Sequence, residues 1–289
     1  AKARNIWIQL YWDGDQSWIS ISDDGDGMSE SVLINAMRLG SDNPVEERSL
    51  TDLGRFGLGL KTASFSQCRS LTVASKSLVA APCLRRWDLD YVVEHNEWRL
   101  LKDYREGAEE QFSSLNEMAH GSVVLLENLD RLCDRQNVEN ETHRRKFFSR
   151  IEILSAHLSM VFHRYLEGNS GIKIYVNGHS ENARIKPWDP FLSSEDATCP
   201  QPEESKNFHK GIVKVKGYVL PHKDKLNKDD HTQAAGLGGW NDQQGFYIYR
   251  NKRLLVAGSW LGLGGRRHGW TKEEHYKLAR IRVDIVNTM

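Results

Sequence analysis

The chain has 289 residues, of which 39 are basic and 39 acidic, so its formal net charge at pH 7 is zero. This balance argues against a protein that coats nucleic acid by overall charge, although it does not exclude a local basic patch. The sequence has no apolar run near the ~18 residues of a membrane span, no signal-peptide pattern and no C-x-x-C pair among its four cysteines. We therefore expect two domains, no membrane contact and a cytoplasmic location, or a nuclear one in a eukaryote.

The chain opens with a predicted antiparallel hairpin. Asn5–Tyr11 and Trp18–Ser22 alternate and are rich in β-formers, and Asp13-Gly14-Asp15 between them is a turn signal. The second strand runs directly into the acidic, glycine-containing segment Asp23–Met28.

Two interpretations of Asp23-Asp24-Gly25-Asp26-Gly27 stay open. One is a solvated acidic turn; an EF-hand is excluded because its spacing and closing Glu are missing. The other is a carboxylate at a strand end that accepts a hydrogen bond from an exocyclic amine such as that of adenine. Gly25 and Gly27 would then let a flat ring approach the backbone.

A helix is predicted from Ser29, as N-cap, to Gly40, and a polar loop from Ser41 to Asp52 follows it. The loop leads into Gly54–Ser64, read as GRFGLGLKTAS. Three glycines before a helix start offer backbone N–H donors to a phosphate, although the Walker order is absent. The alternative is an ordinary glycine-rich turn. A flexible segment that ends in glycines predicts a lid over a nucleotide.

The rest of the chain reads as strands with few helices. Strands are predicted at Ser70–Ser75, Arg85–Tyr91, Trp98–Leu101, Gly121–Glu127 and Ile172–Val176. A long helix, Arg144–Leu166, is predicted before the last of them. Glu181–Asn207, with four prolines, predicts a linker or surface excursion. A second, smaller α+β domain is predicted. Its elements are strands Gly211–Leu220 and Ile281–Ile285, a pair of strands within Gly245–Val256 joined by a polar turn at Arg250–Arg253, a charged loop Lys223–His231 and a short helix Thr271–Leu278.

The order of hairpin, Asp23-x-Gly25-x-Gly27, helix, polar lid, glycine loop and Gly121-Ser122 resembles the GHKL ATPase superfamily, whose nucleotide site is the Bergerat fold. The resemblance implies an α+β fold. A Bergerat-type α/β sandwich, with a mixed sheet and helices on one face, spans residues 1–180. Residues 181–207 form the linker or surface excursion, and residues 208–289 a smaller transducer-like α+β domain. Within the superfamily, GRFGLGLKTASF is most similar to MORC-type ATPases, with MutL as a further relative.

The resemblance implies ATP and Mg²⁺ as cofactors. Asp23 matches the aspartate that binds the adenine amino group, Gly25, Gly27 and Met28 shape the base pocket, and Ser122 completes the hydrogen bonding. The remaining ATP-binding residues that it implies are Gly40, Ser41, Arg55, Phe56, Gly57, Leu58, Gly59, Leu60, Lys61 and Thr62. Two alternatives stay open: Lys61 is a solvated lysine at a helix start, and Arg55 pairs with Glu46 or Glu47 on the surface.

The resemblance also implies that this sequence is a fragment. The general-base Glu and the magnesium-binding Asn are expected upstream of Ala1, and a γ-phosphate-sensing lysine beyond Met289. No catalytic residue and no metal ligand is therefore expected in this chain, and hydrolysis by the chain alone is expected to be slow or nil.

The function implied is an ATP-gated conformational switch that hydrolyses ATP to ADP and phosphate and forms a homodimer on ATP binding. Its output is expected in a DNA-related process: repair, chromatin-like compaction or genome defence. A heat-shock-type protein-remodelling chaperone and a nucleotide-binding interaction module without turnover are the alternatives. Two interpretations of Arg250, Lys252, Arg253, Arg266 and Arg267 stay open: contact with DNA, or a solvated turn, which the zero net charge favours.

Overall fold

Six-stranded sheets form the centre of each of the two units into which the chain divides. The computed structural model describes residues 2–40, 58–131, 141–209, 211–264 and 269–286. Unit 1 holds the described residues up to Ile153 together with Ile172–Ile185. Unit 2 holds Leu154–Gly171 and the described residues from Lys186 onward.

The sheet of unit 1 is mixed. Its strand order is β4-β3-β5-β2-β1-β6, with β1 and β6 parallel and the other neighbours antiparallel. The predicted opening hairpin, β1–β2, is confirmed. The elements of unit 1 are β1 (Asn5–Tyr11), β2 (Trp18–Asp23), α1 (Glu30–Met37), α2 (Gly59–Phe65), β3 (Ser70–Ser77), β4 (Ala80–Asp88), α3 (Leu89–His95), η2 (Glu110–Phe112), α4 (Ser113–Glu117), β5 (Gly121–Glu127) and β6 (Lys173–Val176), and α5 (Glu141–Val161) contributes residues to both units.

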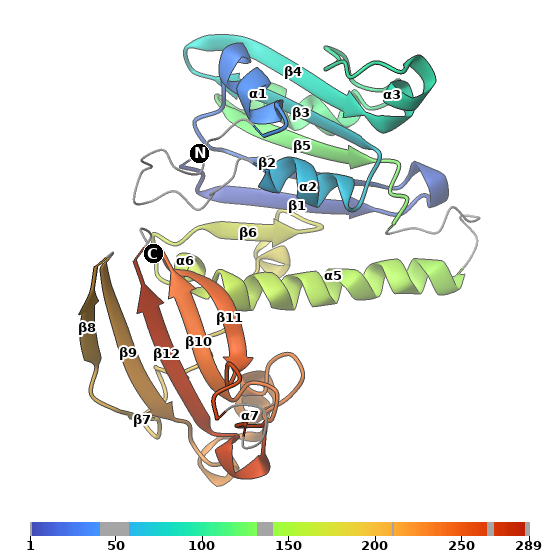
Figure 1. Cartoon of the computed structure of the whole chain (residues 1–289). Coiled ribbons are helices and arrows are strands. Elements are labelled where there is room, and N and C mark those ends of the chain that lie inside the picture. Colours follow the sequence, from blue (N-terminus) through green and yellow to red (C-terminus); the bar gives the residue numbers. More distant parts are fainter. Residues whose placement is uncertain (1, 41–57, 132–140, 210, 265–268, 287–289) are drawn as a thin grey trace. The chain divides into compact units, whose positions relative to one another are not determined.

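Helices α1 and α2 lie on one face of this sheet, in front of it in Figure 1. Leu33 and Met37 of α1 are fully buried against Leu71 of β3 and Leu126 of β5. The mixed sheet with helices predicted from the sequence is therefore confirmed. The structure adds a short layer on the other face, where Phe112 and α4 pack on β3 and β5.

Two strand predictions in unit 1 need correction. The strand expected at Arg85–Tyr91 ends at Asp88, where its side chain accepts hydrogen bonds from two backbone N–H groups and starts α3. The segment Trp98–Leu101 is not a strand, because only Leu101 pairs with β4, through a single bridge.

Unit 2 is also a mixed sheet, in the order β11-β10-β12-β9-β7, with β8 paired to β9. Strands β10 and β12 are parallel. Its elements are α6 (His163–Leu166), β7 (Cys199–Pro200), β8 (Glu204–Phe208), β9 (Gly211–Val219), α7 (Lys228–Ala234), β10 (Gly245–Arg250), β11 (Arg253–Ser259) and β12 (Ala279–Ile285). Phe191, Tyr218, Tyr247, Tyr249 and Leu254 form a buried cluster on one of its faces.

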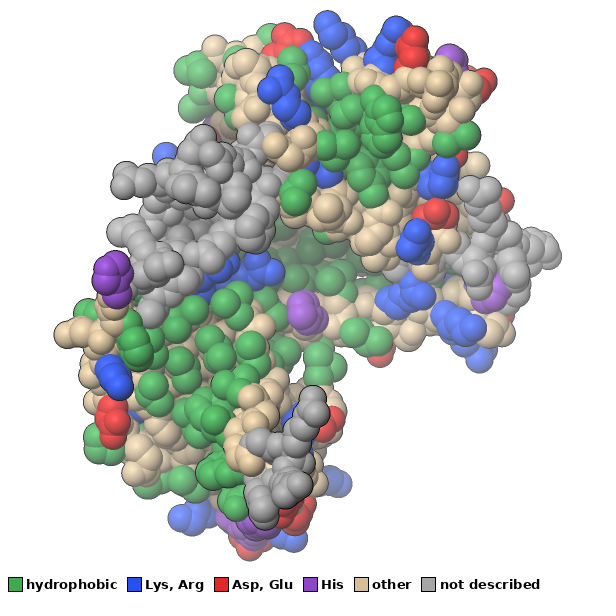
Figure 2. Space-filling view, in the orientation of Figure 1, with side chains coloured by type: hydrophobic (Ala, Val, Ile, Leu, Met, Phe, Trp, Pro, Cys, Tyr) green, Lys and Arg blue, Asp and Glu red, His purple; other side chains and the backbone are tan. Residues whose placement is uncertain are grey.

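The opposite face of this sheet is apolar as well. Strand alternation places Val213 and Val215 of β9, Val283 of β12 and Ile248 of β10 there, all half-buried. Figure 2 shows apolar side chains gathered on the visible face of unit 2.

Three local predictions in unit 2 are also wrong. Glu204–Phe208, which begins inside the segment 181–207 predicted as a linker or surface excursion, is strand β8. Lys228–Ala234 is helix α7 rather than loop, because the Asn227 side chain accepts from the Asp230 N–H at 2.8 Å and caps it. Thr271–Leu278 forms only a 3₁₀ turn, Glu274–Tyr276. Within the described residues, no helix combines the length and apolarity needed to cross a membrane.

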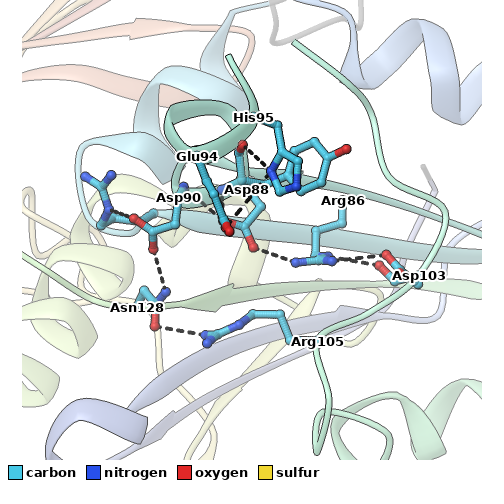
Figure 3. A network of polar contacts seen from close by, with 10 residues as sticks. Arg86, Asp88, Asp90, Glu94, His95, Asp103, Arg105 and Asn128 are labelled. Atoms are coloured by element: carbon cyan, nitrogen blue, oxygen red, sulfur yellow. Dashed lines mark hydrogen bonds and ion pairs between the residues drawn. The ribbon is translucent and has the colours of Figure 1, made fainter. Parts of the chain in front are cut away.

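A network of ion pairs and hydrogen bonds holds α3 to the end of β4 (Figure 3). Arg86 Nη1 donates to Asp88 Oδ2 at 2.5 Å and Nη2 to Asp103 Oδ1 at 3.1 Å. Asp88 Oδ1 accepts the N–H groups of Asp90 at 3.0 Å and Tyr91 at 3.2 Å. The Arg86 and Asp88 side chains are only 11% and 10% exposed, so this pair is largely shielded from water.

The same network reaches the end of β5. Arg69 Nε donates to Asp90 Oδ1 at 2.7 Å, and Asn128 Nδ2 donates to Asp90 Oδ2 at 3.1 Å. Arg105 Nη1 donates to Asn128 Oδ1 at 2.9 Å. The ends of β3, β4 and β5 are therefore linked through polar side chains.

We predict that Arg86→Gln lowers the free energy of unfolding by about 3 kcal/mol, because it leaves the shielded Asp88 carboxylate without its charged partner. Urea denaturation measures the loss. Arg99→Gln is the control: Arg99 pairs with Glu97 at 2.9 Å, but the two side chains are 62% and 53% exposed, so the change should be within about 0.5 kcal/mol. Equal losses in the two variants would contradict the structural role of the network.

Candidate functional site

A polar row of side chains crosses one end of the unit 1 sheet. The register of the strands places the following residues opposite one another on β2, β5, β3 and β4: Asp23, Ser122, Ser75 and Cys83. The apolar Ile6 of β1 lies opposite Asp23 at the end of this row. Because opposite residues share a face, these side chains point to the same side of the sheet. Ile19 and Leu71, four residues along β2 and β3, pack with α1, so the row lies on the face that carries α1 and α2.

Ser75 is the centre of the row. Its hydroxyl accepts the Met28 N–H at 2.8 Å, lies 3.1 Å from the Gly121 carbonyl and 2.9 Å from the Ser122 hydroxyl. A hydroxyl has one proton, so if Ser75 donates to Gly121, Ser122 must donate to Ser75. Ser75 is fully buried. Sequence reasoning missed it, because β3 also holds Ser70, Thr72 and Ser77 and nothing in the sequence sets Ser75 apart from them.

Asp23 ends β2 as a half-buried carboxylate. Its Oδ1 accepts the Gly25 N–H at 2.8 Å, which closes the acidic turn locally. The His120 Nδ1 atom lies 2.6 Å from the Gly25 carbonyl, so His120, also missed by sequence reasoning, donates to this turn. In the described part of the chain, Asp23 Oδ2 has no hydrogen-bond partner, which leaves it as a free acceptor.

Two glycines make this arrangement sterically possible. Gly27 has φ +68°, and a Cβ there would lie 1.9 Å from the Lys76 carbonyl oxygen. Gly121 has φ +149°, and a Cβ there would lie 2.2 Å from the Asp23 carbonyl oxygen. A side chain at either position would force apart segments that contact one another directly.

The pKa values of the adjacent carboxylates Asp23 and Asp24 are shifted in opposite directions. Burial raises the pKa of Asp23 above its ordinary value of 3.8, and the Gly25 N–H only partly offsets this. For Asp24, burial also raises the pKa, but hydrogen bonds from Asn5 and Arg4 outweigh it and hold the pKa below 3.8. Asp24 Oδ1 accepts the Arg4 and Asn5 N–H groups at 2.7 and 2.9 Å, so its role is structural.

The start of α2 lies on the same face of the sheet, since Leu60 and Met28 both pack on the cluster beneath α1. Gly59 is exposed, with nothing within 4 Å of a Cβ placed there. The Thr62 hydroxyl donates to the Leu58 carbonyl at 2.9 Å, which ties it to its own helix.

Lys61 is not the solvated lysine that one reading of the sequence allows. Its side chain is 2% exposed, and Nζ donates to the Ala36 carbonyl at the end of α1 at 2.8 Å. The ammonium group therefore stabilises the negative end of α1.

The other predicted site residues fall into two groups. Gly40 follows α1 and is exposed at φ +68°. The predicted residues Ser41, Arg55, Phe56 and Gly57, with the lid they belong to, lie outside the described residues.

Of the predicted DNA-contacting residues, Arg250 and Arg253 are half-buried and Lys252 is exposed. The Arg253 guanidinium lies 5.8 Å from the Phe162 ring centroid, which directs its charge toward its own unit. Arg266 and Arg267 lie outside the described residues. Among the residues that the structure describes, no group of three or more His, Cys, Asp or Glu side chains is arranged to hold a metal ion.

The N-terminal part of the chain is similar to a known protein family. Residues 1–122 match the family described as "Histidine kinase-, DNA gyrase B-, and HSP90-like ATPase". Among solved structures, the chain is similar to the ATPase and transducer domains of DNA topoisomerase II from Balamuthia mandrillaris, with 13% identity and a TM-score of 0.46. The similarity covers 88% of this chain and 55% of that chain, so this chain spans about half the length of that relative. A search of curated proteins gives no match.

We predict that Gly27→Ala lowers the free energy of unfolding by roughly 3 kcal/mol or more, because the new methyl group meets the Lys76 carbonyl. Gly40→Ala is a matched control. It has the same φ of +68°, but nothing lies within 4 Å of its Cβ, so only the backbone strain of about 1 kcal/mol remains. Urea denaturation compares the two, and equal losses would show that the close approach at Gly27 carries no constraint.

A second prediction follows from the raised pKa of Asp23. Between 3.8 and the raised value, the folded state binds more protons than the unfolded state, so wild-type stability falls as pH rises through this window. Asp23→Asn removes the penalty. Its unfolding free energy relative to wild type should therefore rise through the window and stay higher at pH 7.

The neighbouring Asp24→Asn variant should behave in the opposite way. The lowered pKa of Asp24 contributes stability that is present above 3.8 and lost as pH falls through the folded-state pKa, so the variant should be less stable than wild type at pH 7. Denaturation curves from pH 3 to 7 test both signs. A loss of stability in Asp23→Asn at pH 7 would contradict the assignment of Asp23 as a partly desolvated acceptor.

Proposed function

We propose that this chain, whose residues 1–122 match the family of histidine kinase-, DNA gyrase B- and HSP90-like ATPases, binds ATP on the α1/α2 face of the unit 1 sheet. The observation that carries the proposal is the half-buried Asp23 carboxylate with one free oxygen at the end of the polar row. A carboxylate kept in this position at a cost in stability is typical of a binding site rather than of a structural turn.

The surroundings of Asp23 suit an adenine ring. The free oxygen would accept the exocyclic amino group, and Gly25 and Gly27 place no side chain beside it. Ile21, two residues before Asp23 on the same face, is 36% exposed and provides an apolar surface for the ring. Ser122, level with Asp23 on β5, would add a hydroxyl at the edge of the base.

We infer that the phosphates extend toward the start of α2. The backbone N–H groups near Gly59–Thr62 would meet them, since the Lys61 ammonium is already bound to the Ala36 carbonyl. The resemblance adds Gly40, Ser41 and Arg55–Leu58 to this end of the site. Bound Mg²⁺ would supply positive charge to the triphosphate. The described residues form no metal-ligand cluster of their own, so no step is assigned to the ion.

For the whole protein, we propose an ATP-gated switch with hydrolysis of ATP to ADP and phosphate. ATP binding closes the lid, promotes dimerisation and acts on unit 2 as a transducer, by resemblance to MORC-type ATPases and MutL. A DNA-related process is the leading output. Among the predicted DNA-contacting residues that the structure describes, Lys252 is the exposed one. Stimulation of turnover by DNA in the full polypeptide supports this output, whereas stimulation by unfolded client proteins supports a chaperone, and binding without turnover supports an interaction module.

We predict that ATP and a non-hydrolysable ATP analogue bind wild type, and that Asp23→Asn binds them at least about tenfold more weakly, because a charge-assisted hydrogen bond becomes a neutral one. Isothermal titration calorimetry measures both. Asp26→Asn is the matched control: it removes an exposed carboxylate from the same turn, which pairs with Lys2 at 3.3 Å, and should leave affinity unchanged.

Comparing the binding of GTP with that of ATP makes the test more specific. GTP presents a carbonyl oxygen where adenine has its amino group, so wild type should bind ATP at least about tenfold more tightly than GTP. Asp23→Asn should narrow this preference, because an amide can donate to the carbonyl. Unchanged ATP affinity and unchanged base preference in Asp23→Asn would contradict the proposed adenine site.

A further inference from the structure

A cavity lies on the face of the unit 1 sheet opposite to Asp23. Strand alternation in β2 directs Ile19, Ile21 and Asp23 to the helix-covered face, so Trp18, Ser20 and Ser22 point the other way. There they line a half-open cavity of about 780 Å³, together with residues of β1, η2 and α4. Its volume lies in the range of small-molecule sites.

Aromatic rings form one wall of this cavity. Trp7, Tyr11 and Trp18 all line it. The Tyr11 and Trp18 rings are stacked with centroids 5.3 Å apart and an interplanar angle of 21°. Trp7 is stacked on Tyr175 at 6.2 Å and 14°. Neighbouring rings restrict the orientation of each aromatic side chain, so the wall is formed before any ligand arrives.

Polar groups form the floor of the cavity. Ser20 and Ser22 line it and are only 6% and 9% exposed. The Gln111 Oε1 atom, which also lines the cavity, is buried and lacks a hydrogen-bond partner among the residues that the structure describes. Buried polar atoms are normally satisfied, so the open Gln111 oxygen indicates that a ligand completes it.

The charge of the lining is negative. Glu110 of η2 and Glu117 of α4 line the cavity, and none of the described lining residues is a lysine or an arginine. The nearby Lys76 ammonium group donates a hydrogen bond to the Met118 carbonyl at 2.7 Å. His179 also lines the cavity. Aromatic faces, carboxylates and open oxygen acceptors all attract a cation that carries N–H donors, and an anionic nucleotide is disfavoured.

We propose that this cavity binds a small organic cation of the alkylguanidinium or alkylammonium class. The cationic group lies against the Trp18 and Tyr11 wall, its N–H groups donate to Glu110, Glu117 and Gln111, and Ser20 bonds at the floor. The site is separate from that of ATP, because it lies on the other face of the sheet, and it does not depend on the proposed function.

Calorimetric titration of agmatine, which carries both a guanidinium and an ammonium group, tests the proposal. We expect saturable binding to wild type, at least about tenfold weaker binding to the Glu110→Gln/Glu117→Gln variant and a measurable loss in Ser20→Ala. The control is Glu94→Gln/Glu97→Gln, which removes the same charge from exposed positions outside the cavity and should bind as wild type does.

A second arm uses N-acetyl-arginine methylamide, which represents an arginine of a partner protein. Tighter binding of agmatine identifies a free cation as the ligand source, and tighter binding of the arginine derivative identifies a protein side chain. Binding of neither probe, or equal affinity in wild type and Glu110→Gln/Glu117→Gln, overturns the proposal. Asp23→Asn should bind agmatine normally, so failure of the ATP site and failure of this site are distinguishable.

Discussion

The direct contact between β5 and β2 at Gly121 is the constraint on which the candidate site depends. A Cβ at this position would lie 2.2 Å from the Asp23 carbonyl oxygen, so only a residue without a side chain lets the strands pair to their ends. This pairing brings Ser122 level with Asp23, and the Gly121 carbonyl lies 3.1 Å from the Ser75 hydroxyl. The Ser75 hydroxyl in turn accepts a hydrogen bond from the Met28 N–H and so holds Met28 in place. The absence of a side chain at Gly121 thus permits the contacts that order both the acidic turn and the polar row.

The two residue sets of β2 give the sheet two different surfaces. Ile19, Ile21 and Asp23 face α1 and α2, where apolar packing ends in a carboxylate that accepts one N–H and leaves one oxygen open. The alternate residues face an aromatic cavity bordered by carboxylates. A strand of six residues therefore separates an environment suited to a nucleotide base from one suited to a cation. The polar network around Arg86 and Asp88 holds the far ends of the neighbouring strands.

Much of the fold could be predicted because its signals are local. The hairpin at Asp13-Gly14-Asp15 and the apolar strand Gly121–Glu127 each follow from a turn signal or a run of β-formers, and both are present. The prediction that a strand continues through Tyr91 was wrong because Asp88 caps helix α3. A capping side chain can follow a strand without changing the apolar pattern of that strand. Strand β8 was missed because its side chains are all exposed, which leaves no alternation to read.

The site was predictable only in part. Asp23, Gly27 and Ser122 stand out in sequence because acidic, glycine and hydroxyl residues interrupt strand ends. Ser75 and His120 act through contacts with residues 47 and 95 positions away, and no spacing rule connects such distant segments. The burial of Lys61 against Ala36 is likewise a tertiary contact, so the sequence could place its backbone at a helix start but not its ammonium group.

A crystal structure of the protein with a non-hydrolysable ATP analogue would locate the nucleotide directly. We expect adenine on the α1/α2 face, with its amino group within hydrogen-bond distance of the Asp23 carboxylate, and the ring close to Gly25 and Gly27. A nucleotide bound elsewhere, with both Asp23 oxygens free of it, would contradict the proposed adenine site.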